Sequence, residues 1–434
     1  MRQHNHRRLA ATGLAMLAML VMTGCGGSSS GSSGAEKQGD LTVLKLWTHN
    51  GGNVPELGVV NRMVGDFNKS QTKYKVEVQS FPQQSYNDAV TAAASAKKLP
   101  CIMDIDGPIV PNWAWAGYLE PIDLPADTFA DQLPSTLGKV DDKLYSFGHY
   151  DVALNVTTRK SVLAQNGIRI PTIDQPWTAQ EFDAALAKIK SAGKFAYPLD
   201  LGTAGTGEWI PYAYSPILQS FGGDLINRDN YTTAEGVLNG DAALKWANWM
   251  QSTVNNGYAA KKSGTDSTAD FVNGKTAIMY TGSWAADAVL KKYGDDVLFL
   301  PPPDFGNGPK IGGGSWQWGL SSGCSAKEGG QEFLKFITDN KYYVDYAKTL
   351  GLIPATEKAA AEVPNFKPGG KSRVFYDFAE KLALIRPPTG AYPFISSVYQ
   401  KATSDILAGG DAKSILDKAV SDIDTNIKQN GNYK

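Results

Sequence analysis

Aromatic rings are the side chains best suited to chemistry in this sequence, and that chemistry is the recognition of a ligand surface. The chain contains ten Trp and 19 Tyr among 434 residues. Trp284 follows a Gly-Ser turn, while Trp316 and Trp318 flank Gln317 and so share one face of an extended strand. Ring faces pack against patches of C–H bonds, and carboxylates and amides form paired hydrogen bonds. The aromatic content therefore predicts a binding site.

Motifs for catalysis and metal binding are weak or missing. Neighbouring carboxylates such as Asp104 and Asp106 are common in any acidic chain. A glycosidase needs two acids ~5–10 Å apart across one bond, which sequence spacing does not specify. Residues 27–31 match G-x-S-x-G but lack the strand and helix that give this motif its function. No H-E-x-x-H or C-x-x-C spacing occurs. We expect no enzyme activity, no metal and no cofactor.

The start of the chain has the pattern of a signal peptide. Three arginines precede the apolar run 9–21, which is shorter than the ~20 residues that cross a bilayer core. The string VMTGC ending at Cys25 resembles a bacterial lipobox, in which the cysteine is acylated after cleavage. We expect a signal peptide over 1–24, lipid attachment at Cys25 and a flexible Gly/Ser-rich tether over 25–39. The alternative is a secreted protein without lipid.

Size, charge and cysteine content limit the possible domain number, partners and disulfides of the chain after the expected signal peptide. About 410 residues follow the expected signal peptide, enough for two or three lobes with their own cores. Without the three leader arginines the formal net charge changes from −1 to −4, and no basic cluster favours a nucleic-acid partner. No later stretch is long and apolar enough to span a membrane. Cys101 and Cys324 form either one disulfide or two buried thiols, and their spacing leaves this open.

Alternating strands and helices indicate an α/β fold. Such an order predicts a parallel sheet covered by helices, and ligands of these sheets bind at the carboxyl ends of strands. This rule selects His49, Asn50 and Asp106 as candidate ligand contacts. The expected first elements are strand 41–47, a helix with an apolar face from Val59 to Phe67, strand 75–81, helix 85–96 and strand 101–107.

Later elements follow the same alternation without a fixed repeat. We expect one long strand over 144–158, and a T-x-x-E capping box of Thr178 and Glu181 at the start of a helix. Helical pieces should continue to about residue 260. The other expected elements are a helix end, turn and strand over 270–280, strands 297–303 and 316–322, and helices 331–338, 341–348, 373–384 and 413–427.

Five segments between residue 41 and the C-terminus carry a family pattern. They are 46–50, 142–156, 167–182, 271–284 and 319–337. In order and spacing, these segments resemble the extracellular solute-binding proteins of sugar importers, the group of maltose- and trehalose-binding proteins. Two positions depart from that family: its third strand opens with Pro-Asp where this chain has Pro100-Cys101, and it has Tyr-Asn-Lys after the first crossover where this chain has Thr157-Thr158-Arg159-Lys160. The departures leave the exact sugar open.

The resemblance implies a two-lobed periplasmic-binding-protein fold of type II, with the ligand cleft between the lobes. Cys101 would then begin the third strand, and Cys324 would end an antiparallel strand of the same sheet. The resemblance therefore implies a Cys101–Cys324 disulfide at the end of the sheet that faces away from the cleft. The implied domains are an N-terminal lobe of 40–151 with 310–352 and a C-terminal lobe of 152–309 with 353–434.

Sugar recognition suits the residues at these positions, because pyranose C–H faces stack on rings while hydroxyls bond to planar polar groups. Trp284 could instead pack between the lobes, Asp106 could cap a helix, and Arg386 could form a surface salt bridge. Which of Trp316 and Trp318 faces the cleft stays open. The expected ligand contacts are His49, Asn50, Asp106, Tyr150, Asp151, Glu208, Trp209, Tyr212, Trp284, Gly313, Trp316, Trp318 and Arg386.

The resemblance also implies a function. We expect the substrate-binding lipoprotein of an ABC transporter, anchored by lipid outside the bacterial cell membrane, which captures an oligosaccharide and delivers it to the permease. Its partners would be the sugar and the permease subunits, with no nucleic acid, and the protein would be a monomer. The alternatives are a binder of a polyamine, an amino acid or an iron chelate, and a carbohydrate-active enzyme. The tryptophan content favours a sugar.

Overall fold

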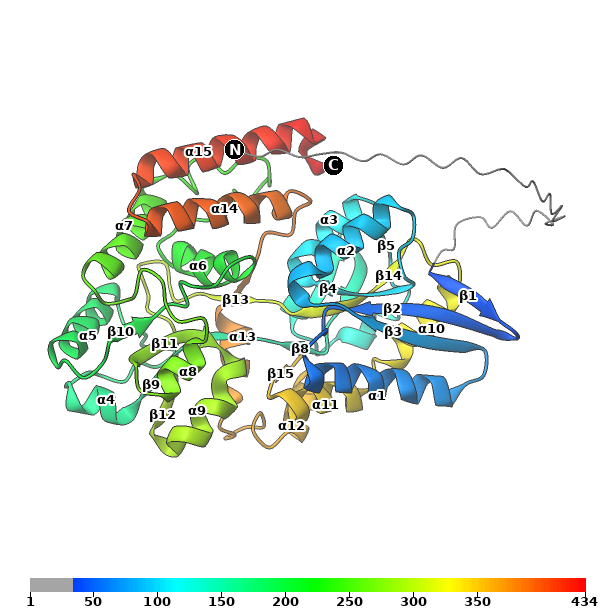
Figure 1. The fold of residues 1–434 in the computed structure, drawn as a ribbon, viewed down its shortest axis with the longest axis horizontal. Coiled ribbons are helices and arrows are strands. Elements are labelled where there is room, and N and C mark those ends of the chain that lie inside the picture. The colour runs from blue at the N-terminus through cyan, green and yellow to red at the C-terminus, as the bar shows by residue number, and fades with distance from the viewer. Residues whose placement is uncertain (1–33) are drawn as a thin grey trace, which may run out of the picture.

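Residues 34–434 are described by this computed structural model, and they form two lobes. The expected signal peptide, the expected lipid attachment at Cys25 and the first part of the expected tether lie outside the described residues. In Figure 1 the blue and cyan N-terminal segments form the lobe on the right, called the first lobe below. The green segments and the red C-terminal helices form the second lobe on the left.

Eight strands form the sheet of the first lobe. They are β1 (Ala35–Gln38), β2 (Leu41–Thr48), β3 (Tyr74–Ser80), β4 (Ile102–Asp106), β5 (Leu119–Glu120), β6 (Leu137–Val140), β7 (Lys143–Phe147) and β14 (Trp316–Ser321). The order is β1-β2-β4-β14-β7-β6, with β3 paired to β2 and β5 to β14. β2 pairs in parallel with β3 and β4, which confirms the predicted parallel arrangement, and β14 joins β4 antiparallel. The parallel pairing brings the carboxyl ends of β2 and β4 together.

Helices cover both faces of this sheet. Met103 and Ile105 of β4 pack in the same core as residues of α2 (Gln83–Ser95) and α3 (Val110–Trp115). The opposite core contains α1 (Val54–Ser70), α10 (Lys327–Phe336) and α11 (Asn340–Leu350). The apolar face predicted for α1, from Val59 to Phe67, is buried there. Burial of both faces explains why β4 is apolar except at the positions that approach its end.

Strand β1 corrects the expected extent of the tether. Residues 35–38 were expected to remain flexible, but they pair antiparallel with β2, from Ala35 opposite Leu44 to Gln38 opposite Leu41. β4 pairs only with Leu46 and Trp47 of β2, so the earlier part of that edge would otherwise have open backbone groups. β1 fills this gap, and the ordered lobe therefore begins before residue 39.

Four strands form the sheet of the second lobe, in the order β10-β11-β9-β12. They are β9 (Leu154–Arg159), β10 (Tyr197–Asp200), β11 (Thr276–Gly282) and β12 (Val297–Leu300). The capping box is confirmed, because Thr178 and Glu181 bond to each other's backbone N–H groups at the start of α5. The helices of this lobe are α4 (Lys160–Gln165), α5 (Ala179–Ser191), α6 (Trp209–Ser220), α7 (Asp241–Asn255), α8 (Ser267–Val272), α9 (Ala286–Tyr293), α14 (Tyr392–Leu407) and α15 (Ala412–Gln429).

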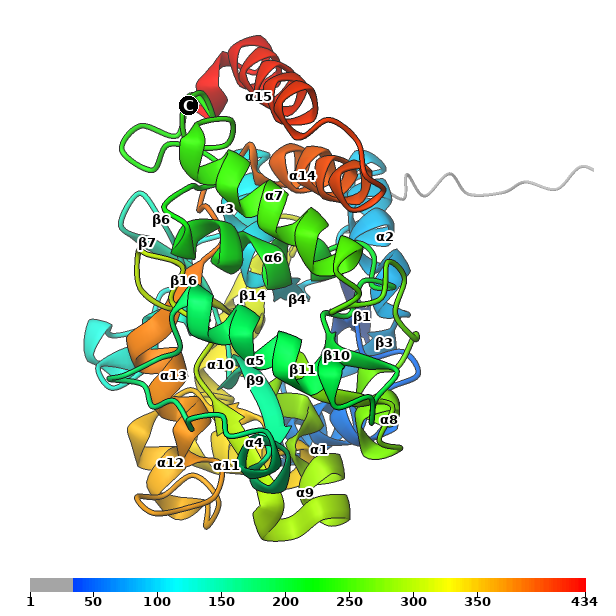
Figure 2. The same cartoon turned by 90° about the vertical axis from the view of Figure 1, so that its left-hand side faces the viewer.

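The connection between the lobes differs from the expected single strand over 144–158. The chain leaves β7, forms the short strand β8 (Tyr150–Asp151) and then enters β9. β8 pairs with β15 (Ile353–Pro354), and β13 (Ile311–Gly313) pairs with β16 (Ala383–Ile385). α12 (Glu357–Glu362) and α13 (Arg373–Leu382) lie between the last two crossings, where Figure 2 shows α13 beside β16. The strand breaks because it must leave one twisted sheet and join another.

Cys101 and Cys324 form a disulfide, the pairing implied by the family topology. Ile102 and Leu320 are direct neighbours across β4 and β14, so the two cysteines lie just beyond this pair at one end of the sheet. His49 and Asp106 lie at the other end. The disulfide therefore ties together segments that are 223 residues apart in sequence without approaching the strand ends of interest.

Candidate functional site

The ends of β2 and β4 bring together a buried polar group. His49 directly follows β2, and its Nδ1 lies 2.6 Å from Oδ2 of Asp104. Thr48 donates to the same carboxylate oxygen at 2.8 Å. Nε2 of His49 lies 3.8 Å from Glu56 at the start of α1. Burial alone lowers the pKa of His49, but the carboxylates of Asp104, Glu56 and Asp106 reverse this and raise it. The surroundings of His49 therefore favour its protonated form at the strand end.

Trp316 stacks on His49. The ring centroids are 3.6 Å apart and the planes differ by 10°. Trp316 begins β14 directly opposite Asp106, and it is half-buried. Trp318 lies on the same face but is only 3% exposed, and its indole N–H donates to Nδ1 of His149 at 3.1 Å. Trp318 is thus part of the core, which corrects its expected ligand contact and leaves Trp316 as the ring near the strand ends.

Arg386 joins the two lobes through two carboxylates. It follows β16 and is 6% exposed. Its Nη2 lies 3.3 Å from Asp106 of the first lobe, and its Nη1 donates at 2.7 Å to Glu208, which precedes α6 in the second lobe. Burial would lower the pKa of Arg386, but the facing charges of Asp106 and Glu208 raise it. Burial raises the pKa of Asp106. The expected surface alternative for Arg386 is therefore wrong.

Aromatic rings of the second lobe lie beside this ion-pair network. Trp284, just after β11, is 44% exposed. It lies 6.3 Å from the ring of Trp209 and 6.3 Å from that of Tyr212, both on α6. The guanidinium of Arg386 lies 5.3 Å from the centre of the Tyr212 ring. Trp209 is fixed by an N–H donated to Gly202 at 2.9 Å. Trp284 is therefore an exposed ring beside the rings of Trp209 and Tyr212.

Several buried polar atoms in this region have no partner among residues 34–434. Both amide atoms of Asn50, the hydroxyl of Tyr212 and Nε of Arg386 are in this state. Asn50 is 1% exposed and follows His49 at the end of β2. A buried polar group without a hydrogen bond costs on the order of 1–3 kcal/mol. Tyr212 and Arg386 lie together beside the exposed ring of Trp284, which is the pattern expected where a polar ligand supplies the missing partners.

Tyr150 and Asp151 form hydrogen bonds within the protein, where the chain crosses between the lobes. Asp151 is completely buried, and its carboxylate accepts from the Ser135 hydroxyl, the Val152 N–H and the Gly314 N–H. Burial raises its pKa. Tyr150 donates to Glu56 at 2.8 Å. Because its bonds are made within the protein and no surface is exposed, Asp151 holds the crossing strands together, which corrects its expected role as a ligand contact.

Gly313 lies in β13, where an added Cβ would meet Ala383 of β16 at 2.8 Å. It also lines a cavity of about 250 Å³, whose wall includes Gly107, Gln317 and Arg386. The close strand packing explains why a residue without a side chain is needed at this position. Gly313 therefore contributes to the crossing between the lobes, beside the network of Arg386.

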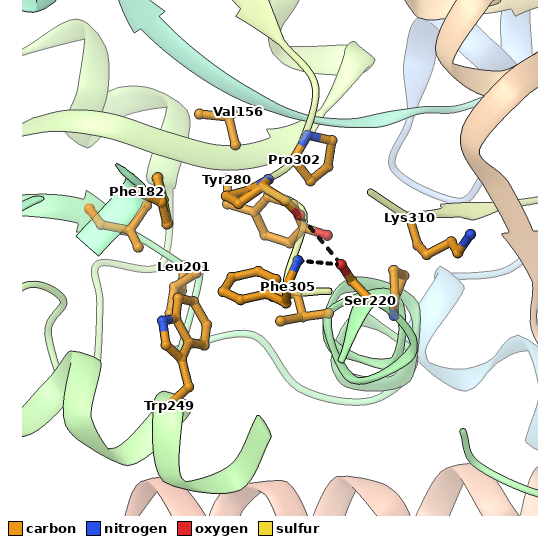
Figure 3. A pocket seen from close by; sticks show the side chains of 13 residues that line it. Val156, Phe182, Leu201, Ser220, Trp249, Tyr280, Pro302, Phe305 and Lys310 are labelled. Carbon is orange, nitrogen blue, oxygen red and sulfur yellow. Dashed lines mark hydrogen bonds between the residues drawn. The ribbon is translucent and has the colours of Figure 1, made fainter. Parts of the chain in front are cut away.

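Two other hollows lie in the described structure. Figure 3 shows a cavity of about 20 Å³ inside the second lobe, lined mainly by apolar side chains such as Phe182, Trp249 and Phe305. It is roughly large enough for one water, and none of the predicted contact residues lines it. An open groove next to His49 is lined by Gly51 to Pro55 and by Gln83 and Gln84. The groove, and not the cavity, adjoins the strand ends.

The sequence reasoning missed some polar partners in the site. Tyr392 donates to Glu208 at 2.6 Å, and Ser396 donates to the other oxygen of the same carboxylate. Both belong to α14, a helix that the periodicity did not predict. Glu56 was also missed, although its position after Asn53 at a helix start is a recognisable signal.

Comparisons with known proteins agree with this architecture. No curated protein matches the chain. Among solved structures, the GacH receptor of Streptomyces glaucescens is 22% identical with a TM-score of 0.73, covering 92% of this chain and 100% of its own. The cyclic alpha-maltosyl-1,6-maltose binding protein of Arthrobacter globiformis is 21% identical with a TM-score of 0.73, covering 89% and 99%. The sugar-binding protein MalE of Xanthomonas citri is 19% identical with a TM-score of 0.73, covering 90% and 98%.

At these identities the solved structures establish the shared fold. The family model described as bacterial extracellular solute-binding protein matches residues 62–369, which is well over half of the chain. Its match extends from α1 to the segment before α13 and so includes both lobes. With two lobes, paired crossing strands and this match, the chain belongs to the family of bacterial extracellular solute-binding proteins.

Proposed function

We propose that this protein is the substrate-binding lipoprotein of an ABC importer, which captures an oligosaccharide and delivers it to permease subunits in the membrane. The observation that carries the proposal is the combination of exposed aromatic surface with buried polar atoms that lack partners. Trp284 supplies the exposed ring, while Asn50, Tyr212 and Arg386 supply the unpaired atoms. A pyranose matches both, because its C–H faces stack on rings and its hydroxyls donate and accept.

The names of similar structures support a sugar as the ligand. The GacH receptor was solved in complex with acarbose, and other similar structures hold maltotriose or maltotetraose. These ligands are oligosaccharides or close mimics of them. The transfer of this ligand class to the present chain rests on the aromatic and polar groups described above.

Closure of the two lobes would hold the ligand. Trp316, His49 and Asp106 come from the first lobe, while Trp284 and Glu208 come from the second. A ligand that contacts both sets binds the closed form more tightly and so shifts the population toward it. The closed form would then dock on the permease as a monomer.

Attachment outside the cell would occur through lipid on Cys25. None of the helices within residues 34–434 is long and apolar enough to cross a bilayer. The sequence pattern around Cys25 supplies the anchor instead. Labelling of cells with a radioactive fatty acid tests this: the wild-type protein should be labelled and Cys25→Ala should not, and equal labelling of both would exclude the anchor.

Calorimetry against di- to hexasaccharides tests the ligand class. We expect at least one member of the panel to bind with one-to-one stoichiometry, and the same sugar should remain chemically unchanged after long incubation. Absence of binding across the panel would reject the sugar assignment. Appearance of cleavage products would instead support a carbohydrate-active enzyme.

A further inference from the structure

His49 lies in a cluster of acids. Asp104 lies at 2.6 Å and Glu56 at 3.8 Å from its two ring nitrogens. Within the described residues, His49 is the only cationic group that forms an ion pair with either carboxylate. Asp106 lies two residues after Asp104 in β4, and its negative charge also raises the pKa of His49. The surroundings therefore favour the protonated imidazole.

The remaining neighbours fix the acids in place. Asn53 and Tyr150 donate to the two oxygens of Glu56 at 2.7 and 2.8 Å. Thr48 donates to Asp104, whose charge also faces the buried phenol of Tyr86 on α2. Because every acid that faces His49 is held by a second contact, the imidazole has one defined orientation.

That orientation places the imidazole face on the indole of Trp316, with 3.6 Å between centroids and 10° between planes. A cation on the face of an indole is attracted by the ring quadrupole, and tryptophan gives the strongest such contact. Tyr86 touches Trp316 with its edge, at 5.8 Å between centroids. The indole is half-buried, so part of its surface remains available. The protonated histidine thus holds the ring that the proposed function uses for stacking.

We propose that His49 is a positioning residue whose protonated ring fixes Trp316 as a stacking platform, so that ligand affinity falls when His49 loses its proton. This inference rests on the proposed sugar-binding function. Capture of the ligand then depends on external pH, and binding is tighter at acidic pH. The carboxylates of Asp104, Glu56 and Asp106 set the pH at which His49 loses its proton and ligand affinity falls.

The binding test compares the wild type with His49→Gln and His49→Arg across pH 5 to 9. Calorimetry uses the tightest oligosaccharide of the panel. The wild type should bind about 3- to 30-fold more weakly once His49 is neutral, a range that corresponds to the energy of a cation on an aromatic face. His49→Gln should bind at the weak level and His49→Arg at the tight level, both without this pH dependence. An identical pH profile in wild type and His49→Gln would overturn the proposal.

A second readout needs no ligand. A protonated imidazole in contact with an indole quenches its fluorescence, so emission should rise as His49 titrates. The rise should coincide with the His49 resonance in a nuclear magnetic resonance titration, assigned by its loss in His49→Gln. Trp316→Phe should abolish the rise while the melting temperature shows that the variant is folded. A rise that persists in Trp316→Phe would overturn the stacking, whereas a normal rise without any saccharide binding would reject only the sugar assignment.

Discussion

Arg386 and Asp106 form a buried ion pair across the two lobes, with 3.3 Å between Nη2 and Oδ1. They are 280 residues apart in sequence. Glu208 completes the group from the second lobe. Removal of one member of a buried ion pair leaves uncompensated charge, which is far more costly than the pair is stabilising. The fold of this protein and its candidate site therefore depend on the same three side chains.

Replacement of Arg386 by Met should lower the free energy of unfolding by about 3–5 kcal/mol, because the buried carboxylate of Asp106 then has no cation beside it. Urea denaturation measures this change. Lys371→Met is the matched control, since Lys371 pairs with Asp295 on the surface, where both side chains are mostly exposed. The control should leave the urea midpoint unchanged. Equal effects of the two substitutions would contradict the role assigned to Arg386.

Trp284→Ala should weaken oligosaccharide binding by at least tenfold, because it removes the exposed ring beside Tyr212. Trp115→Ala is the matched control. The two tryptophans are 44% and 45% exposed, but Trp115 packs on Tyr433, which forms no ion pair or hydrogen bond with Arg386, Asp106 or Glu208. Calorimetry with the same sugar compares them. Retention of full affinity in Trp284→Ala would remove the main aromatic support for the proposed site.

Tyr212→Phe should separate stability from binding. The Tyr212 hydroxyl is buried without a partner in the described residues. Its removal should leave the free energy of unfolding unchanged or raise it by about 1 kcal/mol, since an unsatisfied polar group is lost. Ligand affinity should fall, because the ligand loses a hydrogen bond. A variant that is clearly less stable in urea would show that the hydroxyl already has a partner.

His149 should make the protein sensitive to acid. Burial lowers its pKa to about 4. Its Nδ1 accepts from Trp318 while Nε2 donates to the Ile337 carbonyl, so the neutral ring is the bonded form. Between the unfolded pKa near 6.5 and about 4, the unfolded state binds more protons, so stability falls as the pH falls. Through His149 alone, the free energy of unfolding should be about 3 kcal/mol lower at pH 4 than above pH 6.5.

Urea denaturation at several pH values measures that loss. His49 contributes with the opposite sign, because its pKa is raised: its contribution is complete below pH 6.5 and disappears as the pH rises through the folded value. His49 therefore adds no pH dependence between pH 6.5 and 4, and comparison of the wild type with His149→Gln isolates the acid loss due to His149. An equal change in stability from pH 6.5 to 4 in the wild type and in His149→Gln would contradict the buried neutral state of His149.

The Cys101–Cys324 disulfide should stabilise the protein without affecting the ligand. The double replacement by Ser should lower the free energy of unfolding by about 2–5 kcal/mol, mainly because the unfolded chain gains freedom. Ligand affinity should remain the same, since the disulfide lies at the other end of the sheet from His49. Alkylation of the unreduced protein provides a direct check, and two reactive thiols in residues 34–434 would show that the bond is absent.

Sequence alone determined the local elements and much of their order. Strand and helix periods, the Thr178 capping box and the strand ends at His49 and Asp106 depend on residues close together in the chain, so the pattern contains the necessary information. The disulfide pairing was also accessible, but only through the topology that the family resemblance implied.

The tertiary structure decided which of these groups meet. It placed Trp318 in the core through His149 and brought Trp316 onto His49. It also broke the expected strand over 144–158, because the chain must pass from one sheet to another. The ion pair of Arg386 and Asp106 could not be read from spacing, since no local period relates residues 280 positions apart. Long-range packing alone determines such contacts.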